Sequence, residues 1–379
     1  MSGISRSFFR RAGMLALAVF LPFYAVAAES HILEVEGPRQ WSEIKVRQLI
    51  KDGDTLTLVF RGENAALAVA DFGPSDKAAD SGNRTSLKLA SLTFSGDGAL
   101  YLNDGITLTA DKIYSGPDCG RLTVNPQALN SIWKTQPVQF LEGQVLEVDT
   151  QGADASFGGR LEMAAGTAVR KIGDGMLTLQ KTDAVYAGQL IAAEGTLSVL
   201  STAADRYPGG IYVDAGATFI NGASGTFSAG MLGEVSVYGT LRMGRTTWSA
   251  SGTPRVTLGS SATVDTVDPC FRATSGTFTL HAAKQGLGNT EAVWPALLQA
   301  DGAATFDVDV DKNLLLTMPP PQVAQRVNKA QVELTKSGAG CWRTGEKDAA
   351  GTFTGVSFAH TGSTVVNGGG VRYMFLENK

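Results

Sequence analysis

Residues 171–200 read KIGDGMLTLQKTDAVYAGQLIAAEGTLSVL and contain two short runs in which apolar and polar residues alternate. The first run, residues 176–179, follows a Gly-Asp-Gly turn. The second run, residues 195–199, begins with Gly195, seven residues after Gly188. Alternation with a period of two is typical of a strand with one buried face. Glycine suits the turns because a positive φ angle costs it little. The stretch therefore predicts one coil of a β-solenoid.

Elements of this stretch recur along the chain. A Gly-x-Gly turn followed by an apolar residue occurs at residues 96–100, 173–177 and 338–342, and two glycines seven residues apart occur in 188–195 and 362–369. The glycines that define these repeats are Gly96, Gly98, Gly173, Gly175, Gly188, Gly195, Gly338, Gly340, Gly362 and Gly369. Recurrence of this kind is the signature of a repeat architecture.

A simpler mark, a glycine shortly before a threonine and an apolar residue, begins at Gly195, Gly216, Gly239 and Gly259, at intervals of 21, 23 and 20 residues. This period is typical of stacked coils that hold two or three short strands each. We expect an all-β parallel β-helix. An antiparallel sandwich is the alternative, because it shows turn signals roughly every 8–12 residues as well.

The first 27 residues have the pattern of a secretory signal peptide. They carry Arg6, Arg10 and Arg11 and no acidic residue, followed by an apolar segment, residues 14–27, that ends in Ala-Val-Ala. A membrane anchor is the alternative, but Pro22 breaks the segment, which is also shorter than the roughly 20 residues that span a bilayer. We expect general secretion, with the mature protein in the periplasm, at the cell surface or outside the cell.

The net charge and the amino-acid composition limit the kinds of molecule that the protein can bind. Removal of the three arginines of the signal lowers the formal net charge from −4 to −7, which disfavours nucleic acid and anionic membrane surfaces as partners. The 45 glycines and the low share of charged residues, 18%, are typical of an ordered, turn-rich β protein. No long apolar segment follows the signal, so we expect no membrane span in the mature chain.

Three cysteines, Cys119, Cys270 and Cys341, lie far apart in the sequence. Their odd number allows at most one internal disulfide and leaves one thiol over. Their wide separation disfavours a metal knuckle. We favour isolated thiols, and the pairing stays open.

The chain also shows signals for helices and boundaries. Residues 42–51, with Ser42 as the N-cap, predict a short helix that caps the N-terminal end of the stack. Residues 126–133, which begin with proline, predict a second helix on the flank of the stack. We expect a signal peptide (1–27), an N-terminal cap region (28–91), a β-helix (92–318), a proline-rich linker (319–331) and a C-terminal repeat or cap (332–379).

Residues 169–179, together with the glycines at 188 and 195, resemble the autotransporter-associated β-strand repeat, also called the passenger-associated transport repeat. Residues 334–340 and 361–369 are similar to the first and last thirds of that repeat. The resemblance implies a right-handed parallel β-helix of the kind found in Gram-negative passenger domains, exposed at the cell surface. The chain departs from the family in two ways: the residues after Gly340 are not an apolar strand, which predicts irregular pairing there, and we expect no C-terminal barrel.

An enzyme of the same fold is the alternative, because parallel β-helices host polysaccharide lyases and glycosidases, which need carboxylates that converge from adjacent coils. The candidate catalytic carboxylates are Asp265, Asp268, Asp307 and Asp309. His31, His281 and His360 are scattered and lie in no nucleophile motif. We expect a solvated acidic face rather than a catalytic site.

Asp307, Asp309 and Asp311 alternate with valines, so they share one face of a strand and are weak candidates for a Ca²⁺ site. Lys312 and Met318 stand where an EF-hand loop needs glycine and glutamate. We therefore expect no metal and no cofactor.

These observations favour a nonenzymatic, adhesin-like or structural module, with a host or matrix glycan or a surface protein as partner. A secreted carbohydrate-active enzyme is the alternative. The two differ in one feature: an enzyme needs three or more carboxylates and a base that converge in a groove on the stack.

Overall fold

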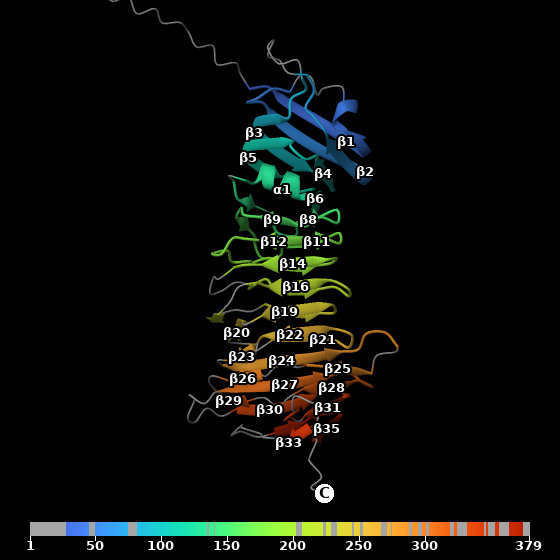
Figure 1. Ribbon diagram of the computed structural model, residues 1–379, viewed down its shortest axis with the longest axis vertical. Helices are drawn as coiled ribbons and strands as arrows, with labels where there is room; N and C mark the ends of the chain where they lie inside the picture. The colour runs from blue at the N-terminus through green and yellow to red at the C-terminus, as the bar shows by residue number, and fades with distance from the viewer. Residues whose placement is uncertain are drawn as a thin grey trace, which may run out of the picture.

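The chain forms an elongated stack of coils, seen in a computed structural model (Figure 1). The stack has about 10 turns, and nearly all of its regular structure is β-strand. The structure describes residues 28–44, 50–74, 82–134, 136–139, 141–201, 207–222, 225–228, 233–244, 246–250, 253–266, 271–273, 275–287, 290–294, 298–300, 303–318, 322–323, 332–344, 346–347, 353–355 and 364–373. The predicted β-solenoid is confirmed.

Each coil supplies up to three strands, and strands at the same place in successive coils form three walls. The first wall consists of β4 (Gly98–Leu102), β6 (Arg121–Val124), β8 (Val145–Asp149), β11 (Ala168–Ile172), β13 (Gln189–Ala192), β15 (Ile211–Val213), β18 (Val235–Val237), β21 (Arg255–Gly259), β24 (Gly276–Ala283), β27 (Ala304–Val310), β30 (Val332–Ser337) and β34 (Thr364–Val366). At its N-terminal end this sheet continues into long, bent strands, β1 (Ser30–Gln40), β2 (Thr55–Val69), β3 (Ser86–Ser95) and β5 (Thr107–Ser115).

The other two walls follow the first in chain order. The second wall holds β9 (Ala155–Phe157), β12 (Met176–Leu179), β14 (Thr196–Val199), β16 (Thr218–Asn221), β19 (Thr240–Gly244) and β22 (Thr263–Thr266), and then β25 (Glu291–Val293), β28 (Leu315–Met318), β31 (Cys341–Thr344) and β35 (Gly370–Tyr373). The third wall holds β7 (Val138–Gln139) and β10 (Leu161–Glu162), and further on β17 (Gly225–Ser228), β20 (Thr246–Ala250), β23 (Phe271–Ala273), β26 (Leu298–Ala300) and β29 (Gln322–Val323).

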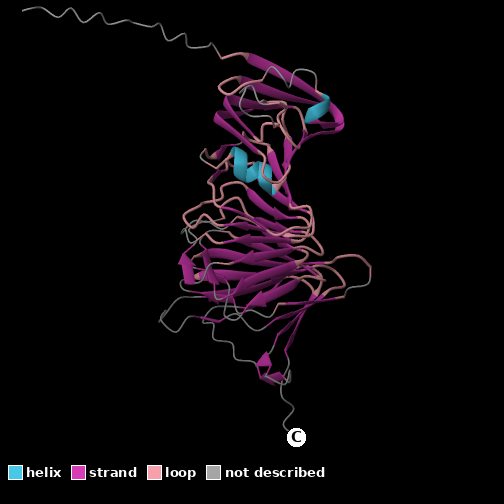
Figure 2. Cartoon of the chain, turned by 45° about the horizontal axis from the view of Figure 1, so that its top comes forward, coloured by secondary structure: helices cyan, strands magenta, loops and turns pink. Residues whose placement is uncertain are grey.

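Pairing within the walls is parallel throughout the described residues. Antiparallel pairing there is confined to β32 (Glu346–Lys347) with β33 (Phe353–Gly355) and to an isolated bridge between Pro74 and Asn83. Figure 2 shows the coils lying flat on one another, with loops at both sides. The antiparallel sandwich is therefore wrong.

Inward-facing side chains form continuous apolar rows along the stack. One row runs in register through Leu122, Leu146, Val169, Leu190, Ile211, Val235, Val256, Leu280 and Val308, each at most 2% exposed. Neighbouring parallel strands are about 4.8 Å apart, so each side chain is covered mainly by its counterparts in the adjacent coils. The burial of the apolar side chains of one coil therefore depends on the strand register of the next coil.

A lysine interrupts one of these apolar rows. Lys171 lies between Val148 and Ala192 and is fully buried. Its ammonium group donates to the carbonyl oxygen of Gly173 in its own coil and to that of Glu194 in the next coil, at 2.9 Å for Glu194. The side chain therefore fastens two successive turns of the same corner.

The second copy of the repeat contains the same device. Lys336 is fully buried, and its ammonium group donates to the carbonyl oxygens of Ser337, Gly338 and Gly368, at 3.1 Å for Gly338 and 3.5 Å for Gly368. Burial lowers the pKa of both this lysine and Lys171. The two Gly-x-Gly copies that share the lysine occupy the same corner, between the first and second walls.

The copy at Gly96 and Gly98 lies at a different corner. It joins β3, which pairs with the first part of β2, to β4, which pairs with the last part of β2. Phe94 stands where the other copies have lysine. A Cβ on Gly96 would collide with the carbonyl oxygen of Phe60. Glycine is required here because one turn passes closely over another. The same Gly-x-Gly motif can therefore lie at different corners of the coil.

Helix α1 (Pro126–Ile132) confirms the predicted second helix. Asn125 caps it by accepting from the amide of Ala128, at 3.0 Å. The helix lies within the second wall, between β5 and β9, rather than on the flank. Its Ser131 hydroxyl accepts from the amide of Leu108 and donates to the carbonyl of the same residue, so a side chain completes the strand edge.

The predicted N-terminal helix over residues 42–51 is not shown. A single 3₁₀ turn, η1 (Trp41–Glu43), is closed by reciprocal contacts between Gln40 and Glu43, and Ile44 already has extended backbone angles. Trp41 is buried against Phe72, with ring centroids 5.4 Å apart. Residues 45–49 lie outside the described residues. Strands β1 to β3 form the N-terminal end of the described stack instead.

Other expectations meet the structure near the C-terminus. The irregular pairing predicted after Gly340 is wrong, because β31 pairs in parallel with β28 and β35 and buries Trp342 completely. In the predicted linker, β29 pairs with β26, and the proline triplet lies outside the described residues. Gly362 also lies outside them.

A search of the described chain for a long apolar helix that could cross a bilayer finds none.

Replacement of Gly195 should test the close approach of successive turns. Gly195 and Gly216 both have positive φ, +55° and +85°, but a Cβ on Gly195 would collide with the carbonyl of Asp174 and the ammonium of Lys171, whereas Gly216 faces open space. We expect Gly216→Ala to cost about 1–2 kcal/mol through backbone strain and Gly195→Ala to cost roughly 1–3 kcal/mol more. Urea denaturation followed by circular dichroism measures both. Equal losses would contradict the steric explanation.

The buried lysines should give stability a pH dependence. Their folded-state pKa values lie below the unfolded value of about 10.4, so the unfolded chain binds more protons in that window. Unfolding free energy should therefore rise as pH increases through the folded pKa toward the unfolded one. A Lys171→Met, Lys336→Met double variant should lack this part of the rise. The exposed Lys112→Met variant is the control, and a double variant with the wild-type slope would refute the prediction.

Candidate functional site

The acidic strand β27 presents its carboxylates as predicted, on one outer face of the first wall. Its buried and half-exposed residues alternate along the strand. Asp307 accepts a hydrogen bond from the hydroxyl of Ser337, at 2.7 Å. Asp309 lies 3.7 Å from the guanidinium of Arg255 and 3.9 Å from the His281 ring. Both carboxylates thus have partners from neighbouring rungs.

Asp311 ends this row in a hydrogen-bonded turn. Its carboxylate accepts from the amide of Lys284 at 2.8 Å and lies 3.1 Å from Nε2 of His281. Burial acts to raise the pKa of Asp311, but the bonds from Lys284 and His281 outweigh it and lower that pKa overall. The carboxylate is therefore held ionised as a structural anchor of the turn.

The second candidate pair is not brought to this face. Asp265 lies on β22 in the second wall and pairs with Arg242, at 3.6 Å. Asp268 lies outside the described residues, as do His360 and Cys270. His31, at the other end of the stack, contacts Asp54 at 2.9 Å. The sequence candidates therefore form separate structural contacts, and no group of three or more metal-ligating side chains occurs among the described residues.

The two described cysteines, Cys119 and Cys341, are free thiols. Cys119 is buried, and burial raises the pKa of its thiol. A thiol of raised pKa carries little thiolate and is a poor nucleophile.

A hollow of about 680 Å³ on the outer face of the first wall was not found from the sequence. Three carboxylate residues, Glu63, Asp97 and Glu147, line it together with Tyr101 and Arg121. They come from β2, β4, β6, β8 and the turns between them, at sequence separations that no motif encodes. Three carboxylates near one another are what an enzyme of this fold would need. Whether they can act in catalysis depends on the hydrogen bonds that each of them makes.

Two of the three carboxylates of this hollow, those of Glu147 and Asp97, accept hydrogen bonds from neighbouring residues, whereas Glu63 is exposed at its edge. Glu147 is nearly buried, and its two oxygens accept from the Thr123 hydroxyl at 3.0 Å and from the Arg170 guanidinium at 2.5 Å. Asp97 accepts from the backbone amide of Arg121 at 2.7 Å. Both carboxylates therefore take part in contacts that hold the strands and turns around them.

The phenol of Tyr101 is also unsuited to act as a base. Burial raises its pKa, and the negative charges of Asp149 and Glu147 raise it further. The phenol therefore keeps its proton at neutral pH and serves as a hydrogen-bond donor.

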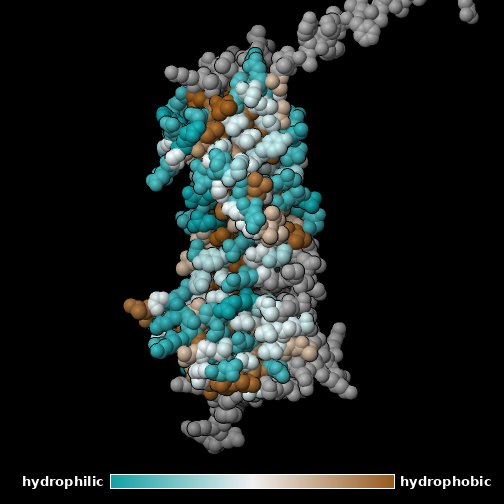
Figure 3. Space-filling model, turned by 180° about the vertical axis from the view of Figure 1, so that it is seen from behind, coloured by the Kyte–Doolittle hydropathy of each residue, from teal (hydrophilic) through white to brown (hydrophobic). Residues whose placement is uncertain are grey.

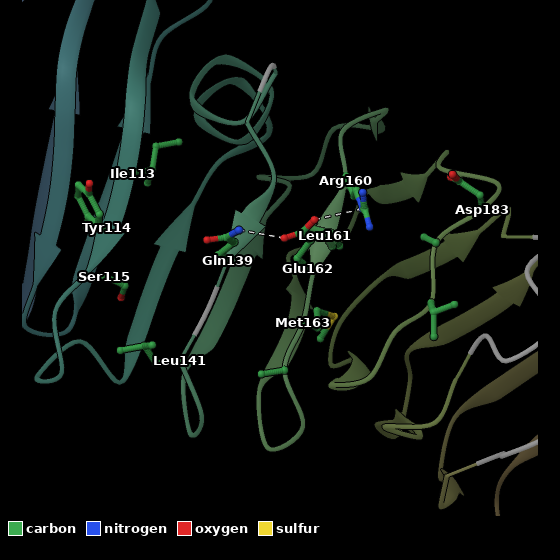
Figure 4. A pocket seen from close by; sticks show the side chains of 13 residues that line it. Ile113, Tyr114, Ser115, Gln139, Leu141, Arg160, Leu161, Glu162, Met163 and Asp183 are labelled. Carbon is green, nitrogen blue, oxygen red and sulfur yellow. Dashed lines mark hydrogen bonds and ion pairs between the residues drawn. The ribbon is translucent and has the colours of Figure 1, made fainter.

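A second hollow, which we call the flank groove, has a volume of about 650 Å³ and lies on the third wall (Figure 4). It begins at the end of β5, passes β7 and β10, and ends at the loop that follows β12. Its lining residues are Ile113, Tyr114, Ser115, Gln139, Leu141, Arg160, Leu161, Glu162, Met163, Ala164, Asp183, Ala184 and Val185. Four successive coils contribute, so the groove follows the long axis of the stack.

The charged groups of the flank groove all lie close to oppositely charged partners. Glu162 accepts from the amide nitrogen of Gln139 at 2.9 Å and lies 3.3 Å from Nε of Arg160 (Figure 4). Asp183 lies 3.3 Å from the ammonium of Lys181. No sequence motif marks this groove, because its residues come together only through the offsets between successive coils.

The chain matches no family model, no curated protein and no solved structure at a significant level.

Calcium should leave this protein unchanged. The carboxylates of Asp307, Asp309 and Asp311 already have hydrogen-bonding or charged partners, and Ca²⁺ binding needs six to eight oxygens that can turn to the ion. We expect no shift of the thermal midpoint on addition of millimolar Ca²⁺ or of a chelator. A saturable upward shift that Asp309→Asn abolishes would contradict this.

Proposed function

We propose that the chain is an exported, nonenzymatic β-solenoid that serves as a structural or adhesive module of the passenger type, at the cell surface or in the periplasm. The parallel stack of about 10 turns supports this assignment, because such a stack offers long flat walls for broad contacts. The signal-like N-terminal sequence and the resemblance of residues 169–197 to the autotransporter-associated repeat favour export.

The observation that carries the nonenzymatic part is the state of Glu147. Both of its oxygens are occupied by Thr123 and Arg170 inside the hollow that otherwise has the composition of a catalytic groove. A glycosidase or lyase needs one carboxyl group that gives up a proton and another group that accepts one. Structural use of this carboxylate favours a role in binding or architecture.

The surface is compatible with contact through separate patches. On the face drawn in Figure 3, apolar residues form patches among polar ones rather than one continuous stripe. Such a surface suits contacts with hydrophilic partners and gives no reason to expect permanent burial of an entire wall.

A carbohydrate-active enzyme is the second candidate, favoured by the convergence of Glu63, Asp97 and Glu147 beside Tyr101. Incubation of the purified chain with neutral and acidic polysaccharides, followed by assays for new reducing ends and for unsaturated products, tests it. We expect no turnover. Turnover that Glu147→Gln abolishes, while the folded state is kept, would replace our proposal with the enzyme.

Export is tested by expression of the full chain with a C-terminal tag in a Gram-negative host. We expect the mature N-terminus, read by mass spectrometry, to lie near Ala28, and the protein to leave the cytoplasm. A variant that lacks residues 1–27 is the matched control and should stay in the cytoplasm. Recovery of the full chain in the cytoplasm with an intact N-terminus would overturn the proposal.

A further inference from the structure

We propose that the flank groove binds a neutral saccharide chain, laid along the axis of the stack. This inference rests on the proposed adhesive function and names the ligand class for it. Three features of the groove carry it: its direction, its exposed apolar side chains and its balanced charges.

The direction of the groove matches an extended polymer better than a peptide strand. Residues 113–115, 139, 141, 160–164 and 183–185 line it from four successive coils. An extended saccharide chain laid along this axis contacts side chains of several coils in turn. A peptide that adds a strand runs along one strand edge and contacts one or two coils.

Exposed apolar side chains gather in the groove. Tyr114, Leu141 and Val185 are 51%, 54% and 44% exposed, and they are three of the eight large apolar residues that the described chain leaves exposed. Tyrosine has a flat ring with one polar tip, which suits contact with the C–H face of a sugar while its hydroxyl stays in water. Clustering at one hollow distinguishes these residues from scattered surface apolar groups.

The polar groups supply directional hydrogen bonds without net charge. Within the groove Arg160 balances Glu162, and Lys181, which lies beside the groove, balances Asp183, in both cases through an ion pair at 3.3 Å. Gln139 extends this row of planar groups from the neighbouring strand (Figure 4). Sugar hydroxyls both donate and accept, so they can bridge paired carboxylate, amide and guanidinium groups. An anionic polymer would need an excess of cations, which this groove does not provide.

The test is affinity electrophoresis of the mature chain through gels that contain neutral polysaccharides, such as a β-glucan, a xylan or a dextran, or the acidic polymers alginate and polygalacturonate. We expect retardation by at least one neutral polymer. Tyr114→Ala should weaken that binding at least tenfold, whereas Tyr114→Phe should keep it, because the ring makes the contact. Tyr212→Ala is the matched control, since Tyr212 lies on β15 of the first wall, outside the groove.

The circular dichroism melting curve of each variant shows whether it folds, and Gln139→Ala provides a second variant at a short, exposed strand. Neutral-polymer binding that survives Tyr114→Ala and Gln139→Ala would overturn the groove as the site, while export and adhesion would still stand. Binding to acidic polymers alone, to extended peptides alone, or to no polymer would overturn the saccharide assignment. Failure of the proposed function shows separately, as cytoplasmic retention in the fractionation experiment.

Discussion

Close parallel stacking of coil on coil is the constraint on which the whole structure depends. A rung spacing of about 4.8 Å leaves room for a backbone but not for a Cβ wherever one turn passes over another. Gly195 therefore lies against the carbonyl of Asp174, and Gly369 against that of Gly340. The same spacing aligns aliphatic residues into rows that no coil could bury alone. The sequence repeats therefore reflect the fixed distance between stacked coils.

The two buried lysines form hydrogen bonds with the backbone carbonyl groups at the corner between the first and second walls. Turn carbonyls at this corner point toward the two buried lysines, and a buried carbonyl without a hydrogen bond costs free energy. Lys171 and Lys336 carry an ammonium group on a long apolar stem, so the stem continues the aliphatic row and the tip satisfies the carbonyls of two coils. Burial of the charge opposes this gain, which is why the pKa of each lysine is lowered.

The sequence predicted what local spacing encodes. Alternation in residues 176–179 and 195–199, the glycines of the turns and the proline-led helix at Pro126 all depend on residues close in the chain, and the structure agrees with them. The predicted N-terminal helix over residues 42–51 is not shown: Ile44 has extended backbone angles, and residues 45–49 lie outside the described residues. Neither hollow was predicted from the sequence. The offset between successive coils varies along the chain, and this offset decides which distant side chains lie together.

Helix α1 explains why the flank groove lies where it does. A helix is about 10 Å wide, roughly twice the rung spacing, yet α1 takes the place of one strand, in the coil between those of β5 and β9. In the first wall β4, β6 and β8 stay paired without a gap, whereas β5 and β7 are not paired with each other among the described residues. The flank groove lies where this pairing is missing, between the end of β5 and β7. A helix signal in an otherwise regular solenoid thus marks the coil at which a binding surface can form.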